Sequence, residues 1–330
     1  MSEVMSKPVL VIHGGADAIP RSQMTDDLAL RHHAGLRAAL LAGQRVLVAG
    51  GSAVDAVTEA VVALEDDLHF NAGRGAVFAA NGHIEMDAAI MDGRDRAAGA
   101  LAGINGPRNP VRAARAVMED PALVLLHGTG ALAFCLGAGL PFEQESYFHS
   151  ERRWSELQHE LARRDAAAID LASSRGAHGT VGAVALDSGG NLAAATSTGG
   201  MTGKTPGRIG DTPLIGAGTW ARNGVCAISA TGVGEAFIRH SAAHEIDARI
   251  RLGGQSLEVA TTAVVAEVAA DGGDGGLIAV DQAGNVSLPF SCQGMYRGVA
   301  AGTAPPLTAI YAGEPLRDHN GGEDRGKGWR

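Results

Sequence analysis

The chain has 330 residues, of which 45% are hydrophobic and 19% charged, so it can bury a sizeable core, and global disorder is excluded. Its net charge is −9 and it has no block of Lys and Arg interleaved with aromatic residues, so nucleic-acid binding has little support. No secretory signal or membrane-spanning apolar stretch is visible, and three widely spaced cysteines fit a reducing compartment, so we expect a cytoplasmic protein without a membrane partner.

The first part of the chain predicts one strand, two helices and a hairpin, in that order. Residues 8–14 are a short apolar run that ends in Gly-Gly, as a strand does. Leu and Ala at helical spacing predict a helix over 24–50. A second helix is predicted over 51–67, with Ser52 as its N-cap and an acidic residue three positions later. Residues 75–93 predict a strand, an Asn-Gly turn and another strand.

The middle of the chain predicts two more helices, a linker and a second hairpin. One helix begins near Pro110, and the charged residues 151–172 predict the other. The stretch 170–179 then resembles a linker. Two short apolar runs follow, and they flank Ser-Gly-Gly at 188–190, which is a hairpin signal.

The last part of the chain repeats the alternation of strands and helices. A strand is predicted over 224–232, helices over 234–254 and 255–271, and a hairpin over 276–290. The polar, Gly-rich residues 316–330 are expected to form a loose tail. Hairpins rather than βαβ crossovers connect the strands, which favours an α+β fold of antiparallel sheets with helices outside them.

Three threonines stand at predicted strand ends, each close to a glycine. If 188–190 form a three-residue turn, Thr198 lies across from Thr180, within one residue for a bulge. A third strand ends in Thr231-Gly232, so the three hydroxyls could gather at one edge of a sheet. Thr is also common in strands simply because it is β-branched, and that structural interpretation stays open.

The chemistry that would need such threonines is catalysis by an N-terminal nucleophile. A Thr hydroxyl needs a base within hydrogen-bond reach. A cut before Thr180 would create an α-amine with a pKa of roughly 7.7–8.0, which can serve as that base near neutral pH. Thr198 would then orient the nucleophile. Gly179 suits the position before the cut because glycine tolerates strained backbone angles.

A Gly- and Pro-rich loop over 199–218 offers contacts for an amino-acid substrate. Arg208 can hold a carboxylate through two hydrogen bonds, and Asp211 can hold an ammonium group. The alternative is an ordinary solvated loop with a surface ion pair. Asn71 either donates a hydrogen bond to the site or caps a turn.

Other suggestive residues are interpreted as structural. His240 and His244 could face one metal ion from a helix, but no HExxH glutamate accompanies them, so a surface or core pair is expected. His13 and His178 are candidate bases that no spacing connects to the threonines. Residues 128–139 contain glycines without a phosphate-binding motif.

The sequence resembles a known family, the plant-type L-asparaginases and isoaspartyl peptidases, which are Thr-dependent N-terminal-nucleophile hydrolases. The likeness runs along nearly the whole chain. It is carried by a series of ordered motifs: IHGGA (12–16), AVVALEDDLHFNAGRGAVF (60–78), MDAAIMDG (86–93), HGTVGAVALD (178–187), ISATGVGE (228–235) and GMYRG (294–298).

The resemblance implies a fold, a maturation step and a reaction. The fold would be a single α+β domain over 1–330, a four-layer αββα sandwich with antiparallel sheets. Self-cleavage would yield an alpha subunit, 1–179, and a beta subunit, 180–330, and two such pairs would form a dimer. The enzyme would hydrolyse L-asparagine and β-aspartyl dipeptides to release L-aspartate.

The resemblance also implies the site residues. Thr180 would be the nucleophile assisted by Thr198, and Thr231 with Gly232 would form the oxyanion site. Arg208 and Asp211 would hold the α-carboxylate and α-amine of the substrate, and further contacts would come from Gly200, Gly234 and Asn71. Catalysis would need no cofactor. A structural sodium ion would be bound by the backbone carbonyls of Leu64, Glu65, Asp67, Phe70, Ala72 and Arg74.

The sequence departs from the family pattern in places. Asp17 stands where many members have Gly, Ser291-Cys292-Gln293 differs from the usual Asn-Thr-Glu, and 143–178 resembles the family only weakly. Two alternatives therefore stay beside the main hypothesis. One is a glycosylasparaginase-like hydrolase, against which the His-Gly-Thr motif argues. The other is an inactive, uncleaved binding scaffold.

Overall fold

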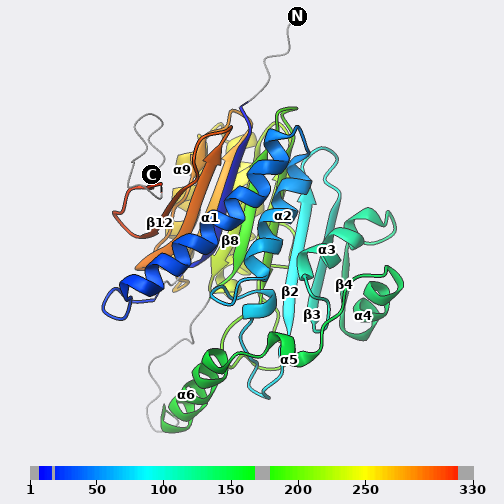
Figure 1. Ribbon diagram of the computed structural model, residues 1–330. Coiled ribbons are helices and arrows are strands. Elements are labelled where there is room, and N and C mark those ends of the chain that lie inside the picture. The colour runs from blue at the N-terminus through cyan, green and yellow to red at the C-terminus, as the bar shows by residue number, and fades with distance from the viewer. Residues whose placement is uncertain (1–6, 17–18, 168–178, 319–330) are drawn as a thin grey trace, which may run out of the picture.

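The computed structural model describes residues 7–16, 19–167 and 179–318, and its strands form two sheets (Figure 1). The larger sheet has the order β12 (Leu307–Tyr311), β11 (Gly294–Ala301), β1 (Val9–Ala16), β5 (Val181–Leu186), β6 (Leu192–Thr198), β2 (Met86–Asp92), β3 (Ala98–Ile104), β4 (Leu125–His127). The smaller sheet has the order β10 (Val286–Ser287), β9 (Gly275–Asp281), β8 (Cys226–Gly232), β7 (Thr219–Arg222).

Neighbouring strands in both sheets are antiparallel, apart from the parallel pair β3 and β4. The hairpin of β5 and β6 has the register that the three-residue turn predicts, because Val181 lies opposite Ser197 and Leu186 opposite Leu192. Strand β1, from the start of the chain, lies between β11 and β5. The expected mixed fold with antiparallel sheets is therefore confirmed.

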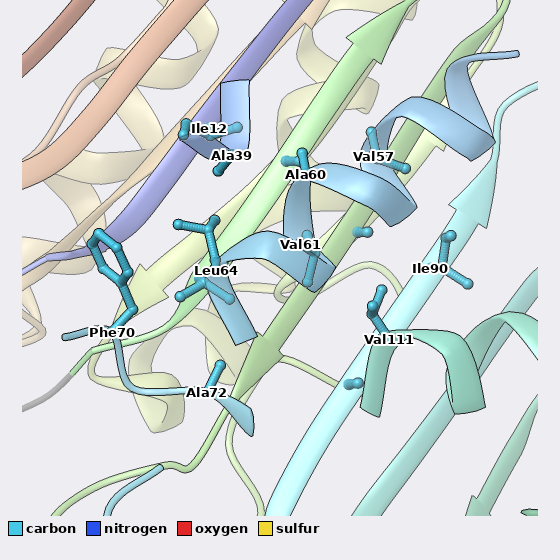
Figure 2. Packing of buried hydrophobic residues seen from close by; sticks show 14 of the residues in the cluster. Ile12, Ala39, Val57, Ala60, Val61, Leu64, Phe70, Ala72, Ile90 and Val111 are labelled. Atoms are coloured by element: carbon cyan, nitrogen blue, oxygen red, sulfur yellow. The ribbon is translucent and has the colours of Figure 1, made fainter. Parts of the chain in front are cut away.

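Strand β1 shows how the core is divided. Leu10 and Ile12 point toward the helices, whereas Val9 and Val11 point toward the second sheet. A strand that is buried on both faces needs apolar residues at successive positions, which explains the continuous run Val-Leu-Val-Ile. Figure 2 shows Ile12 on the helix side of the sheet, in the same apolar cluster as Leu64.

Helices cover the outer faces of both sheets. On the larger sheet lie α1 (Asp26–Val48), α2 (Ala53–Glu65) and α3 (Pro110–Glu119), and on the smaller sheet α8 (Ala242–Arg251) and α9 (Leu257–Ala270) (Figure 1). The predicted N-cap Ser52 accepts a hydrogen bond from the backbone N–H of Asp55, as expected. None of the helices in the described part of the chain is long and apolar enough to cross a membrane.

Five further helical segments connect these elements in the described part of the chain. They are the single 3₁₀ turn η1 (Gly73–Gly75), α4 (Gly128–Gly137), α5 (Glu145–Phe148), α6 (Glu151–Ala167) and α7 (Gly234–His240). Residues 128–139, which contain no phosphate-binding motif, include the whole of α4 and the two residues that follow it.

Two predicted elements are wrong. Residues 76–82 form no strand beyond an isolated bridge between Ala79 and Lys204, because the N–H of Ala79 bonds to the carbonyl of His83 in a turn. The helix predicted over 234–254 breaks at Ser241, whose φ of 47° is left-handed and ends α7 before α8 begins.

The start of the predicted loose tail is packed against the larger sheet. Leu316 is buried and Arg317 forms two backbone hydrogen bonds with Thr308, so the first residues of the expected tail pack on β12. Residues 319–330, Asp17, His178 and the linker through residue 178 lie outside the described residues.

Candidate active site

The β5–β6 hairpin brings two of the predicted threonines together. Thr180, directly before β5, is 7% exposed and donates a hydrogen bond from Oγ1 to Oγ1 of Thr198 at 3.1 Å. The Thr198 hydroxyl accepts a second bond from the N–H of Gly200 at 2.9 Å. Both side chains project from the sheet face turned toward the smaller sheet, because they alternate in step with Val184 and Ala194 of the inter-sheet core.

The carbonyl group of Gly179 is held by two donors. Its oxygen accepts hydrogen bonds from Asn71 Nδ2 at 2.7 Å and from Thr198 Oγ1 at 2.9 Å. Asn71 also donates to the carbonyl of Gly200, and its own Oδ1 accepts from the N–H of Val77. The side chain is therefore fixed in one orientation. Two donors on one carbonyl oxygen would stabilise negative charge that develops there.

Thr231 occupies a place that the sequence did not predict. It belongs to β8 of the smaller sheet, so the three threonines do not share one sheet edge. Its Oγ1 accepts a hydrogen bond from the N–H of Ala16 at 3.0 Å. Ala16 follows Gly15, where an added Cβ would lie 3.0 Å from Gly179 Cα and 3.3 Å from Thr180 N. Thr231 and Gly232 thus approach the Thr180 region from the facing sheet.

Arg208 lies in the predicted substrate loop and is engaged with an acidic residue that sequence reasoning missed. Its Nε and one terminal nitrogen donate to the two carboxylate oxygens of Glu235, both at 2.8 Å. This fork is the geometry in which a guanidinium group holds any carboxylate. The arginine is therefore shaped to receive a carboxylate. No local signal in the sequence links Glu235, at the start of α7, to the loop.

Asp211 is buried beside the start of α7. Its Oδ2 has no hydrogen-bond partner in the described part of the chain, and burial raises the pKa of this carboxyl to about 7. A Cβ at Gly234 would lie 2.8 Å from Asp211 Oδ1, so the glycine lets α7 approach the carboxyl. A buried, unsatisfied acceptor of this kind suits a ligand that brings its own donor.

Gly200 follows the end of β6, and its backbone forms hydrogen bonds with Asn71 and Thr198. Its φ of 83° is left-handed, which glycine adopts without strain, and the side chain of Lys204 packs over it. Lys204 is buried and donates from Nζ to the carbonyl of Glu85, and burial lowers the pKa of its ammonium group.

Carbonyl oxygens converge in the loop after α2. The carbonyls of Asp67 and Leu68 lie 3.0 Å from the place that a Cβ of Gly75 would take, and the carbonyl of Phe70 is closer still. The carbonyl of Leu64 accepts from the N–H of Asp67 within the same turn. A cradle of backbone oxygens can hold a hard cation. In the described ranges, no cluster of His, Cys, Asp or Glu side chains could hold a metal ion.

The histidines divide into two cases. His240 pairs with Asp271 at 2.7 Å, whereas His244 packs edge-on against Trp220, so the two do not face one metal. The sequence predicts a structural role for His13, but its Nδ1 lies 2.8 Å from the carbonyl oxygen of Thr180. Because His13 alternates in step with Val9 and Val11, its side chain lies between the two sheets. No nearby motif in the sequence connects His13 to Thr180.

Comparisons with known proteins agree along almost the whole chain. A family model described as Asparaginase matches residues 6–310. The isoaspartyl peptidase of Escherichia coli (strain K12) is 49% identical over 314 residues, which are 93% of this chain and 97% of that protein. That of Salmonella typhimurium is 50% identical over 315 residues, 93% and 99% of the two chains. The human isoaspartyl peptidase/L-asparaginase is 41% identical over 278 residues, 84% and 88%.

Proposed function

Because the chain belongs to the Asparaginase family, we propose that it is a self-processing amidohydrolase that cleaves β-aspartyl dipeptides and L-asparagine and releases L-aspartate. The arrangement that carries the proposal is Thr180 beside Thr198, with two donors on the carbonyl oxygen of Gly179. Two relatives named isoaspartyl peptidase match 93% of the chain, and the human relative is named isoaspartyl peptidase/L-asparaginase. The two facing sheets with helices outside them would be the four-layer αββα sandwich of N-terminal-nucleophile hydrolases.

The first step is self-cleavage. Oγ1 of Thr180 attacks the carbonyl carbon of Gly179, and Asn71 and Thr198 stabilise the charge on its oxygen. The C–N bond then breaks, the hydroxyl proton ends on the departing nitrogen, and an ester remains. Water hydrolyses this ester, so that Gly179 ends in a carboxylate and Thr180 gains a free α-amine.

The second step is turnover of substrate. Arg208 would hold the α-carboxylate in place of Glu235, and the unsatisfied oxygen of Asp211 would accept from the α-ammonium group. The α-amine of Thr180 takes the proton of its own hydroxyl, which attacks the side-chain amide carbon. Thr231, whose oxygen already accepts from Ala16, keeps its hydrogen for the developing oxyanion, together with the N–H of Gly232. Ammonia or an amino acid leaves, and water releases L-aspartate.

Three accompanying features belong to the same proposal. A sodium ion would be held by carbonyls of the loop after α2, which is supported by the oxygens converging at Gly75. It would stabilise the loop that carries Asn71. A dimer of cleaved units is inferred from the family resemblance alone. A cytoplasmic location is supported by the cysteines, none of which forms a disulfide.

Mass spectrometry of the denatured protein after incubation near pH 7.5 tests the maturation step. We expect two fragments that meet at Gly179 and Thr180, and a single uncut chain from Thr180→Ala, because that variant lacks the attacking hydroxyl. Thr180→Ala should also release no L-aspartate from either substrate. Turnover by this variant would rule out the nucleophile.

A substrate panel then tests the specificity of the cleaved enzyme. The panel contains L-asparagine, a β-aspartyl dipeptide, the corresponding α-aspartyl dipeptide and glycosylasparagine, with L-aspartate release as the readout. Hydrolysis of the first two alone is expected. Preferential cleavage of glycosylasparagine would instead favour a glycosylasparaginase-like hydrolase. An uncut chain without turnover would favour a binding scaffold.

A further inference from the structure

A buried polar chain crosses the space between the two sheets next to Thr180. His13, Gly182 and Thr196 lie side by side on β1, β5 and β6, as the register of these strands shows. Ser229 enters from β8 of the smaller sheet above Gly182, and its Oγ lies 2.9 Å from His13 Nε2 and 2.7 Å from Thr196 Oγ1. All of these side chains are fully buried.

Gly182 is necessary for this arrangement. Its φ is not in the left-handed region, so backbone conformation does not demand a glycine. A Cβ at this position would overlap Ser229 Oγ and crowd His13 Nε2. The glycine two residues after Thr180 thus provides the space in which the histidine and serine meet.

The direction of each hydrogen bond in the chain follows from its two ends. The carbonyl oxygen of Thr180 can only accept, so His13 must carry its hydrogen on Nδ1. Burial lowers the pKa of His13 to about 3, so the ring is neutral and Nε2 accepts from Ser229. A hydroxyl has one hydrogen, so Thr196 donates to Ser229.

The same reasoning gives the direction of the last hydrogen bond, which joins Thr219 and Thr196. Thr219 of β7 lies 2.6 Å from Thr196, oxygen to oxygen, and must donate to it because the hydrogen of Thr196 is already used. The chain therefore runs one way, from Thr219 through Thr196 and Ser229 to His13. It ends on the main chain of Thr180 and joins strands of both sheets.

We propose that His13 is a positioning residue for the nucleophile, which holds the carbonyl group of Thr180 through Nδ1–H in a tautomer that the Ser229–Thr196–Thr219 chain maintains. This inference rests on the proposed role of Thr180. Once Thr180 is a chain terminus, the peptide bond to Val181 is its one remaining connection to the main chain. The carbonyl group of Thr180 lies in the plane of that peptide bond, so a hydrogen bond to its oxygen also fixes the position of the Thr180 Cα. Thr198 holds the hydroxyl on the other side, so the amine and the hydroxyl keep their mutual geometry.

Replacing His13 with two different amides separates this role from simple packing. The amide nitrogen of Asn is attached to Cγ, as Nδ1 is, whereas the amide of Gln reaches the position of Nε2. His13→Asn should therefore keep kcat of the cleaved enzyme within about threefold, whereas His13→Gln should lower kcat about tenfold or more, as for loss of one hydrogen bond to a buried carbonyl. KM should change little in both, because the ring does not contact the substrate.

The controls keep this test separate from that of the proposed function. Wild type and Thr180→Ala are assayed in parallel, and melting temperatures show that both amide variants fold. Equal losses of kcat in Asn and Gln, beside an active wild type, would overturn the role of His13. An inactive wild type would instead contradict the proposed function, and the next measurement would still test the tautomer.

Nitrogen NMR of the ¹⁵N-histidine-labelled protein tests the tautomer directly, without any assay of activity. The ring of His13 is assigned as the signal missing from His13→Asn. We expect a neutral ring with its hydrogen on Nδ1, and a hydrogen on Nε2 would refute the directed chain.

A matched pair of serine variants tests the link through Ser229. Ser229→Ala should lower kcat several-fold. Ser287→Ala, which removes a similarly buried hydroxyl bonded to Thr261 at 2.7 Å, should leave kcat unchanged. Equal kcat in the two variants would contradict the role given to the chain.

Discussion

At the scale of the single residue, Asp211 combines burial with a carboxylate oxygen that has no partner in the described residues. Burial raises its pKa to about 7, so the group is half ionised near neutrality before any ligand arrives. Arg208 attracts the ionised form, but the cost of burial is the larger effect. A substrate ammonium group would supply the missing donor and stabilise the negative charge.

This pKa predicts how substrate binding depends on pH. A raised carboxyl pKa means that the charged form is present above about pH 7 and is lost as pH falls. KM for L-asparagine should therefore rise below pH 7, approaching about tenfold per pH unit well below the pKa. Kinetics from pH 5.5 to 8.5 measure this. Asp211→Asn should have a raised KM that no longer varies over this range, and a flat wild-type KM would contradict the assignment.

The residues that sequence reasoning found differ from those it missed in how far apart their partners lie. Thr180 and Thr198 are 18 positions apart in one hairpin, so counting from the turn was enough. His13 and Glu235 act on residues that tertiary pairing brings to them. The partner of His13 is 167 positions away and directly precedes a strand whose neighbour the sequence does not reveal.

At the scale of the element, the β5–β6 hairpin is tied to α2 through Asp187. One oxygen of this buried carboxylate accepts from the N–H of Asn191 at 2.8 Å and closes the turn. The other accepts from the N–H of Ala53 at 3.1 Å, in the first turn of α2. The helix N-terminus favours a negative charge, so Asp187 stabilises the turn and the helix together.

Asp187→Ala should lower the free energy of unfolding by about 2 kcal/mol or more, because two N–H groups lose their acceptor. Urea unfolding in the Thr180→Ala background measures this on one covalent chain. Asp281→Ala is the matched control, because Asp281 closes the β9–β10 hairpin through the N–H groups of Ala283 and Asn285 and, among the described residues, forms no hydrogen bond with a helix. The control should lose less, and equal losses would contradict the link to α2.

Elements with local signals could be predicted and elements without them could not. Ser52 begins α2 and the Ser-Gly-Gly turn shapes the hairpin, and both depend on residues within a few positions. Residues 76–82 begin with an apolar run and end in Asn-Gly, which is typical of a strand and a turn, but Ala79 pairs with Lys204, far away in the sequence. The break at Ser241 was missed because helical spacing continues through it and only the backbone turns.

At the scale of the whole molecule, the two predicted fragments interleave in one sheet. Strands β1 to β4 belong to the first fragment, and β5, β6, β11 and β12 belong to the second. Because β1 lies between β11 and β5, and β2 lies beside β6, the fragments share three strand junctions in the larger sheet. Pulling them apart would therefore break the sheet open in three places.

Cleavage should accordingly leave the molecule in one piece. Size-exclusion chromatography of the fully cut protein should give the elution volume of uncut Thr180→Ala in native buffer. The fragments should separate only after denaturant breaks the sheet. Elution of either fragment alone in native buffer would contradict the shared junctions.

The interleaved sheet also sets the order of events in the life of the molecule. Asn71 and Thr198, the donors on the Gly179 carbonyl, come from opposite sides of the proposed cut and meet where β2 pairs with β6 in the folded chain. Under the proposed self-cleavage, the bond would therefore be cut only in a chain that has already folded. Maturation would then act as a proofreading step, because a misfolded copy would never expose the α-amine of Thr180 and would stay inactive.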